Sequence, residues 1–190
     1  MRKLALFPLP TARKLKNKKP LILACILCFS TVACVNAHAE EGDEVSLRAA
    51  IILAMLRYTS WSERENAPLT ICSYGSPVSH DKLDEAVSGA NYLTDGAFYK
   101  EILKEEDLGV CDVVVIGASV EKIQNKLLFS NKFTVCDGCR GLQEESIATL
   151  RKVDRNIRFN INLSVATEAK IVLSSELLAL ALSVRRADDD

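Results

Sequence analysis

Histidine is almost absent from this chain of 190 residues. Only His38 and His80 occur, and His80 lies beside a proline-containing turn. Hydrolases that use a serine or cysteine nucleophile need a nearby general base, most often histidine. We interpret His80 as an ordinary surface-loop histidine, so no Ser–His or Cys–His dyad is expected elsewhere in the folded domain. The sequence therefore predicts a protein that is not an enzyme.

Glycine-rich phosphate loops and converging carboxylates are also missing. The one glycine-rich patch, 138–141, surrounds a cysteine, and it lacks the pattern of a nucleotide-binding loop. The acidic pairs Glu105-Glu106 and Glu144-Glu145 are sequence neighbours, and neighbours on a helix do not point at a common atom. We expect no cofactor and no resident metal.

Acidic residues are missing from the first 39 positions. Seven basic residues occur before position 20, an apolar run covers 21–35, and Ala37-His38-Ala39 supplies small residues at its end. This order is typical of a secretory signal peptide, and the apolar run is short for a membrane span of about 20 residues. We predict cleavage after Ala39, with an uncleaved signal anchor or a lipoprotein box at Thr31–Cys34 as alternatives.

Export changes the charge of the chain. Removing the seven basic residues leaves 17 basic and 25 acidic residues in 40–190, a net charge of −8. Binding to a phosphate backbone needs a basic face, so we expect no nucleic-acid partner. The remaining segment is the size of one ordinary domain, 40–186, followed by a solvated acidic tail at 187–190.

Four cysteines remain after the predicted cleavage. An even number of cysteines in an exported chain predicts disulfides, although four cysteines allow three pairings. Cys72 and Cys111 fall on predicted strands and could staple them if the strands are neighbours. Cys136 and Cys139 form a C-x-x-C motif, which fits a structural or redox-sensing disulfide, a catalytic dithiol, or half of a zinc site. No proline follows Pro77, which counts against a thioredoxin-like enzyme with its cis-proline.

The hydrophobic pattern predicts an α/β domain with a mixed β-sheet flanked by helices and stapled by disulfides. The run Val113–Ile116 is typical of a strand covered on both faces. Strand, amphipathic helix and strand over 111–135 predict a βαβ unit, with Ser119 as N-cap and Leu127 facing inward. The full set of predicted helices is 44–58, 81–87, 119–129, 143–149 and a last helix capped by Ser174-Ser175-Glu176; the predicted strands are 69–74, 111–117, 132–135 and 157–163.

Two segments carry less direct signals. Residues 98–103 have a helical composition but lie between two strand-like units, so both interpretations stay open. Arg185 and Arg186 are expected in the final turn of the last helix, where cations complement the helix dipole.

The order of several short patterns resembles the YfiR-like family of exported bacterial proteins. The patterns are Tyr58-x-x-Trp61 after a first helix, Leu69–Cys72, Cys111–Gly117, Phe133–Val135, Arg158–Leu163, and then Ile171, Ser174 and Leu177–Ala181. Their order, their spacing and the two cysteine positions together make the resemblance, which covers nearly all of residues 45–186.

The resemblance implies a function and a fold. A YfiR-like protein in the periplasm binds the periplasmic domain of an inner-membrane diguanylate cyclase and represses it, which lowers cyclic di-GMP. An outer-membrane lipoprotein can sequester the inhibitor, and the redox state of the cysteines affects its folding. The family fold is α/β, and a homodimer is expected. Cys72 and Cys111 match the family's strand-linking disulfide. Residues 98–103 would be a strand.

Aromatic residues are the candidates for partner contact. Tyr58, Trp61 and Phe159 combine apolar area with an anchoring shape, although each also suits the core. The alternatives to a cyclase inhibitor are an exported thiol–disulfide oxidoreductase that uses Cys136 and Cys139, and a periplasmic module that binds a small ligand.

Overall fold

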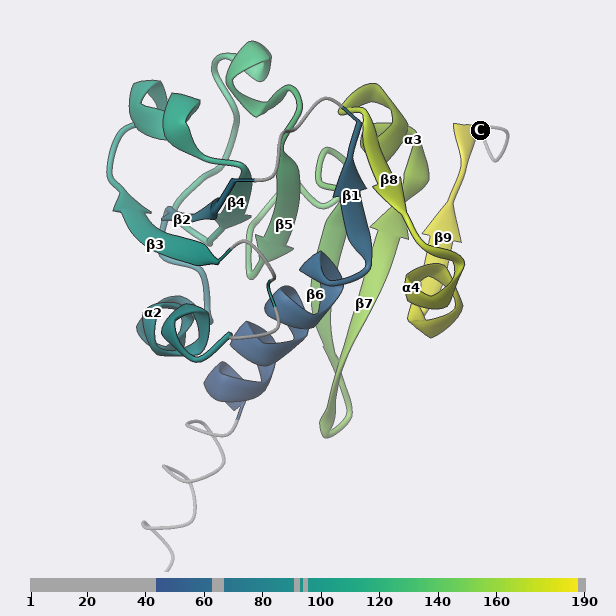
Figure 1. Ribbon diagram of the computed structural model, residues 1–190. Coiled ribbons are helices and arrows are strands. Elements are labelled where there is room, and N and C mark those ends of the chain that lie inside the picture. The colour runs from purple at the N-terminus through teal and green to yellow at the C-terminus, as the bar shows by residue number, and fades with distance from the viewer. Residues whose placement is uncertain (1–43, 63–66, 91–92, 94–95, 188–190) are drawn as a thin grey trace, which may run out of the picture. The chain divides into compact units, whose positions relative to one another are not determined.

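A computed structural model describes residues 44–62, 67–90, 93 and 96–187 (Figure 1). The predicted signal peptide and most of the acidic tail lie outside these residues. The described residues after Glu41 belong to one compact unit of mixed α/β structure. Its first element is a helix over residues 44–56, close to the predicted range.

The elements follow one another with short connections. The strands are β1 (Thr59–Trp61), β2 (Leu69–Tyr74), β3 (Ala97–Ile102), β4 (Val113–Ile116), β5 (Phe133–Asp137), β6 (Ala148–Val153), β7 (Asn156–Asn162), β8 (Ile171–Leu173) and β9 (Ser183–Arg185). The helices are α2 (His80–Ser88), α3 (Leu163–Glu168) and α4 (Ser175–Leu180), with 3-10 turns η1 (Glu105–Val110) and η2 (Lys126–Phe129).

The main sheet has seven strands in the order β3-β2-β4-β5-β6-β7-β9. All neighbours are parallel except the β6–β7 hairpin, so the predicted mixed sheet is confirmed. Strands β1 and β8 form a separate antiparallel pair, which lies in front of the main sheet in Figure 1.

The two faces of the main sheet are covered differently. The front face carries the larger core, to which the helix at 44–56, α2, α3, α4 and the β1–β8 pair all contribute (Figure 1). The back face carries a smaller cluster built from η1, η2 and loops. Strand β4 separates the two clusters, because Val113 and Val115 belong to the front cluster and Val114 and Ile116 to the back one. This arrangement confirms the prediction of a strand buried on both faces.

The predicted helix at 119–129 is wrong. The described chain has only the short turn η2 in this segment, and Leu127 is 80% exposed. Backbone N–H groups that a helix would direct to its own carbonyls are bound by side chains instead. The Glu105 carboxylate accepts from Gln124 N and Asn125 N, and Asn125 Oδ1 accepts from Leu127 N. The parallel pairing of β4 with β5 is as predicted, but its crossover is not an α-helix.

The predicted helix at 143–149 is also wrong, because Ala148 begins strand β6. This strand is held on both sides, by β5 in parallel and by β7 in a hairpin. Two sets of ladder hydrogen bonds outweigh a weak local helical preference.

Strand pairing also decides the structure of residues 98–103. Strand β3 lies in register with β2 from Ala97 to Ile102. The helical interpretation is therefore wrong, and the strand is confirmed.

The last helix begins as predicted and ends early. Ser174 caps it by accepting a hydrogen bond from Leu177 N, at 3.3 Å. The helix ends at Leu180, and Leu182 N donates to Phe159 O at 2.8 Å to start the pairing of β9 with β7. Arg185 is therefore on β9 and Arg186 follows it, so neither lies in the final helical turn as predicted.

Candidate functional site: two disulfides on one face of the sheet

Two disulfides lie on the back face of the main sheet. Cys72, on β2, is bonded to Cys111, which ends η1 just before β4; their Cα atoms are 5.9 Å apart. Cys136, on β5, is bonded to Cys139 in the loop that follows, with a Cα separation of 5.3 Å. Because β2 and β4 are neighbours, the first bond is the strand-linking disulfide that the resemblance implied.

Both disulfides belong to the same small hydrophobic cluster. Its other members include Leu108, Val114 and Leu142, and all four cysteines are buried. Short 3-10 turns bury less apolar surface than the helices of the front face. Covalent links between loops and sheet therefore contribute to the stability of a layer that has a small core.

A buried lysine lies next to the first disulfide. Lys132 Nζ donates to Cys111 O at 2.5 Å and to Gly109 O at 3.4 Å. Burial lowers the pKa of this ammonium group, and the nearby Asp112 carboxylate partly opposes that shift. The lysine satisfies the carbonyl groups at the end of η1 and so helps to fix the position of Cys111.

The second disulfide is anchored to the front layer through Asp137. One carboxylate oxygen accepts from Arg48 of the N-terminal helix at 2.7 Å, and the other accepts from Ser79 N at 2.7 Å. Asp137 is fully buried and Arg48 nearly so. Arg48 also pairs with Glu44, which binds Lys152 at 2.6 Å. The Arg48–Asp137 ion pair therefore holds the C-x-x-C loop against the N-terminal helix.

Comparison with known families identifies the chain. A family model described as YfiR/HmsC-like matches residues 45–182, which include both disulfides and every described strand except β9. The chain belongs to the YfiR/HmsC-like family. No curated protein matches the sequence.

Solved structures give weaker similarities to this YfiR/HmsC-like chain. An ABC domain in complex with L-Trp from Streptococcus pneumoniae is 11% identical, with a TM-score of 0.48 over 72% of this chain and 60% of that one. A conserved domain protein from Vibrio cholerae O1 biovar El Tor is 13% identical, with a TM-score of 0.44 over 74% of this chain and 60% of that one. The chain thus spans about three fifths of the length of each.

The catalytic and zinc interpretations of the C-x-x-C motif receive no support from the geometry. Cys136 and Cys139 are buried, whereas a catalytic dithiol must present an accessible sulfur to its substrate in every turnover. The helix expected after the motif is absent, so no helix N-terminus lies there to lower a thiol pKa. All four sulfur atoms are paired in disulfides, which removes the thiolates that zinc would need.

His80 is more connected than its sequence context suggested. It is the first residue of α2, and its Nδ1 lies 3.3 Å from Ser73 Oγ and 3.2 Å from Tyr99 Oη. Its Nε2 lies 3.8 Å from a Glu101 carboxylate oxygen. The interpretation as a plain surface-loop histidine is therefore corrected. Ser73 is only 1% exposed and also bonds to Tyr99 at 2.8 Å, so this network ties α2 to the sheet.

The three aromatic candidates have different environments. Tyr58 follows the N-terminal helix and is 37% exposed. Trp61, on β1, and Phe159, on β7, are partly buried and pack against the front core. The indole Nε1 of Trp61 is enclosed and has no hydrogen-bond partner among the described residues. The structure does not bring the three together into a demonstrated partner site, and their role stays a prediction.

Sequence reasoning missed two kinds of functional candidate. The Arg48–Asp137 pair joins residues 89 positions apart, and no local pattern signals such a pair. Exposed apolar side chains were also missed, notably Phe98 on β3 and Leu103 just after it, which are 64% and 81% exposed. Residues 98–103 show no period-two alternation that would signal the exposure of Phe98, and only the sheet order places β3 at an edge.

The described helices include none that is long and apolar enough to cross a membrane.

Proposed function

We propose that this chain is an exported regulator that binds the periplasmic domain of an inner-membrane diguanylate cyclase and holds it inactive. The observation that carries the proposal is the YfiR/HmsC-like match across residues 45–182. The N-terminal pattern of a basic region, a short apolar run and Ala37-His38-Ala39 supports delivery to the periplasm. A homodimer and an outer-membrane lipoprotein that sequesters the inhibitor complete the proposed system.

Inhibition requires that the regulator bind the inactive cyclase more tightly than the active one. A binding partner shifts an equilibrium only by its differential affinity for the two states. Moving the cyclase from mostly active to mostly inactive, from 99:1 to 1:99, needs a difference of about 10⁴-fold in affinity. Exposed apolar side chains such as Tyr58, Phe98 and Leu103 are suited to provide binding energy of this kind.

The disulfides give the proposed regulator sensitivity to redox state. Both bonds fix loops to the back face, and reduction would loosen that layer and weaken the inhibitory surface. Cells in which Cys72 and Cys111 are replaced by alanine should then behave as if the regulator were partly absent. The comparison with a Cys136→Ala, Cys139→Ala strain distinguishes the contributions of the two bonds.

Deleting the gene tests the function directly. We expect intracellular cyclic di-GMP and surface-attached growth to rise, and both to return to their starting levels when the wild-type gene is restored. The measurement is mass-spectrometric quantification of cyclic di-GMP in matched cultures. No rise in the deletion strain would contradict repression of a cyclase.

Tyr58 offers the cleanest test of a contact residue. Tyr58→Ala should weaken capture of the cyclase's periplasmic domain at least about tenfold if this side chain is a binding anchor, while the melting temperature changes little because the ring is exposed. Truncating Trp61 or Phe159 would change both binding and stability, since both rings pack against the core. Unchanged capture by the Tyr58 variant would remove this residue from the proposed surface.

A further inference from the structure

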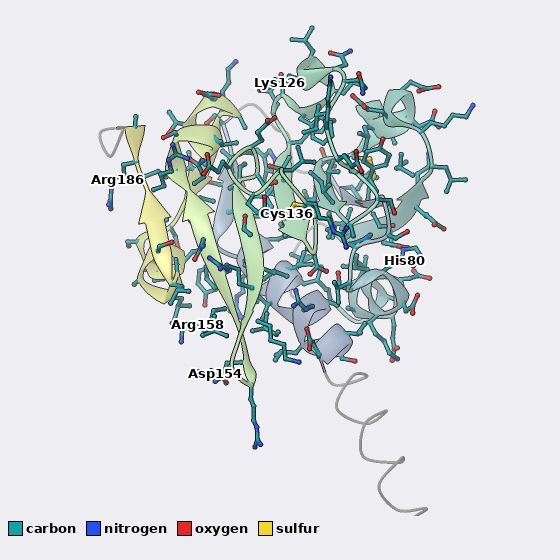
Figure 2. All side chains as sticks on the ribbon, turned by 180° about the vertical axis from the view of Figure 1, so that it is seen from behind. His80, Lys126, Cys136, Asp154, Arg158 and Arg186 are labelled. Carbon is teal, nitrogen blue, oxygen red and sulfur yellow. A yellow bond between two sulfur atoms is a disulfide. The ribbon has the colours of Figure 1, made fainter. Side chains whose placement is uncertain are left out.

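The back face of the main sheet changes character at strand β6. Over β2, β4 and β5 it is covered by the apolar cluster and the two disulfides. Over β6, β7 and β9 the back-facing side chains are polar apart from Val153, and three of them are arginines. In Figure 2, which views this face, β6 and β7 are seen with no helix in front of them, and Arg158 lies on the uncovered part.

Strand register explains why these side chains gather. Thr149 lies opposite Cys136 on one side and Asn160 on the other, so it shares their face of the sheet. Asn160 in turn lies opposite Ser183. Side chains alternate between faces along each strand, and the back face therefore also carries Arg151, Arg158, Asn162 and Arg185, which stand two residues from these positions.

A pocket of about 540 Å³ lies on this polar surface. Its floor is formed by β6, β7 and β9, and one wall by the loop that carries the Cys136–Cys139 disulfide, with Gln143 and Glu144 beyond it. A volume of this size is within the range of sites for small molecules, about 300–1,000 Å³. Two arginines, Arg151 and Arg185, are the cations among its lining residues.

Arg151 has no ionic partner in the described part of the chain. Its neighbour across the strand pair is another cation, Arg158, and like charges directly opposite each other destabilise a sheet. An uncompensated pair of this kind is unexpected in a chain with a net charge of −1. An anion bound beside Arg151 would relieve the repulsion, and the forked guanidinium group suits carboxylate or phosphate oxygens.

The second arginine is held by an internal competitor. Arg185 Nη1 lies 3.1 Å from a Glu144 carboxylate oxygen, and the Glu144 side chain is 82% exposed. Glu144 is the single acidic residue in the lining. An exposed ion pair of this type contributes little free energy, so an incoming anion can displace the Glu144 carboxylate from Arg185.

The floor also offers neutral hydrogen-bonding groups. Asn160 Oδ1 is enclosed and has no hydrogen-bond partner among the described residues. Thr149 Oγ1 donates to Gln143 O at 3.0 Å, and Gln143 Nε2 donates to Cys139 O at 3.1 Å, so the wall is fixed by its own hydrogen bonds. A ligand with hydroxyl groups as well as anionic groups would match this lining.

We propose that this pocket binds a small organic anion that carries carboxylate or phosphate groups together with hydroxyl groups. Arg151 and Arg185 hold the anionic groups, and Gln143 and Asn160 contact the hydroxyl groups. A second copy of the chain docked through the same surface would place arginines against arginines, which disfavours that occupant. This inference does not depend on the proposed cyclase interaction.

The test uses the full chain, expressed with its own N-terminal segment for export and purified in its oxidised form. Citrate and pyrophosphate are the probes, titrated separately by calorimetry at about 0.1 M salt, where the screening length is about 10 Å. We expect saturable binding of at least one probe with one site per chain. Tighter binding of citrate would identify carboxylate as the recognised group, and tighter binding of pyrophosphate would identify phosphate.

Three variants locate the binding. Arg151→Ala and Arg185→Ala should each weaken the affinity about tenfold or more, because each removes a charge-assisted contact. Glu144→Gln should strengthen it about threefold by removing the competitor. Arg155→Ala is the matched control, because Arg155 is exposed in the β6–β7 turn and does not line the pocket. This substitution removes the same charge outside the pocket, and we expect the affinity to change less than twofold.

Two results would overturn the proposal. The first is the absence of saturable binding of either probe up to about 5 mM with folded protein. The second is binding that the Arg151 and Arg185 variants leave as strong as in the wild type, or that the Arg155 variant weakens equally. Arg151 is exposed and the Arg185 side chain is 40% exposed, so the alanine variants should fold, and a thermal melt verifies this in the same samples.

Discussion

At the scale of single residues, the Arg48–Asp137 pair connects the N-terminal helix to strand β5. Asp137 accepts hydrogen bonds at its carboxylate from Arg48 and Ser79 N, and at its backbone carbonyl from Val78 N. A buried charge is tolerated only when it is paired and hydrogen-bonded. The pair thus explains why a charged residue stands inside the C-x-x-C motif.

Breaking this pair should destabilise the protein strongly. Arg48→Met leaves the Asp137 carboxylate buried without its cation, which costs about 3–5 kcal/mol. Denaturant unfolding followed by circular dichroism measures the loss. Arg57→Met is the control, because Arg57 is exposed at the end of the same helix and its loss should change stability by less than about 0.5 kcal/mol. Equal effects of the two substitutions would contradict the structural role of the pair.

Glu44 predicts a dependence of stability on pH. The hydrogen bond from Lys152 is the main cause that lowers the pKa of Glu44 from 4.5, with Arg48 adding to it and burial opposing it. A carboxyl group whose pKa falls on folding stabilises the native state above its unfolded pKa. That contribution is lost as the pH falls through the lower, folded value.

Glu44→Gln should therefore cost about 0.5–1 kcal/mol at pH 7, a modest value because the side chain is partly exposed. The difference from the wild type should shrink as the pH falls below 4.5. Urea unfolding at pH 7, 5 and 3.5 follows it, with the exposed Glu121→Gln as control. A difference that stays constant with pH would show that ionisation of Glu44 is not its source.

At the scale of elements, the turn that follows β2 packs closely against the end of β4. A Cβ atom on Gly117 would overlap the backbone of Ser76 and Pro77. Gly117 N also donates to Tyr74 O at 2.8 Å. The turn after β2 and the exit of β4 therefore meet at a point where only glycine fits, next to the loops that cover the back face.

Gly117→Ala should disrupt this contact. Overpacking against backbone atoms, which cannot rotate away, costs about 1–3 kcal/mol and occasionally more. Gly109→Ala is the matched control, because a Cβ atom there meets nothing within 4 Å. Thermal unfolding of both variants compares them. A Gly117 variant as stable as the Gly109 variant would show that the turn can move aside.

At the scale of the whole molecule, the two disulfides should contribute unequally. Cys72 and Cys111 are 39 positions apart, and Cys136 and Cys139 only three. In the chain-entropy model the larger loop gives about 3–4 kcal/mol and the smaller about 2 kcal/mol. Denaturant unfolding of the two double alanine variants measures both values. A larger loss from the Cys136–Cys139 variant would mean that the Asp137 anchor, not loop entropy, dominates.

The sequence by itself determined the features that depend on local composition. The Val113–Ile116 run predicted a strand buried on both sides, the alternation at 157–163 predicted β7, and Ser174 predicted a helix start; each is confirmed. The cysteine count, together with the expected export, predicted disulfides, and two are present. These predictions succeeded because the burial pattern and the helix cap can be inferred from neighbouring residues. The oxidised state of the cysteines was inferred from the expected compartment.

Tertiary structure decided what local preference left open or misassigned. Residues 98–103 and 148–153 became strands because a neighbouring strand offers a hydrogen-bond ladder, and 119–129 lost its helix because Glu105 and Asn125 bind the backbone there. The Arg48–Asp137 pair and the arginine-lined pocket join residues distant in sequence. Such contacts depend on sheet order, and a backbone ladder or buried ion pair stabilises a segment more than its own propensity does.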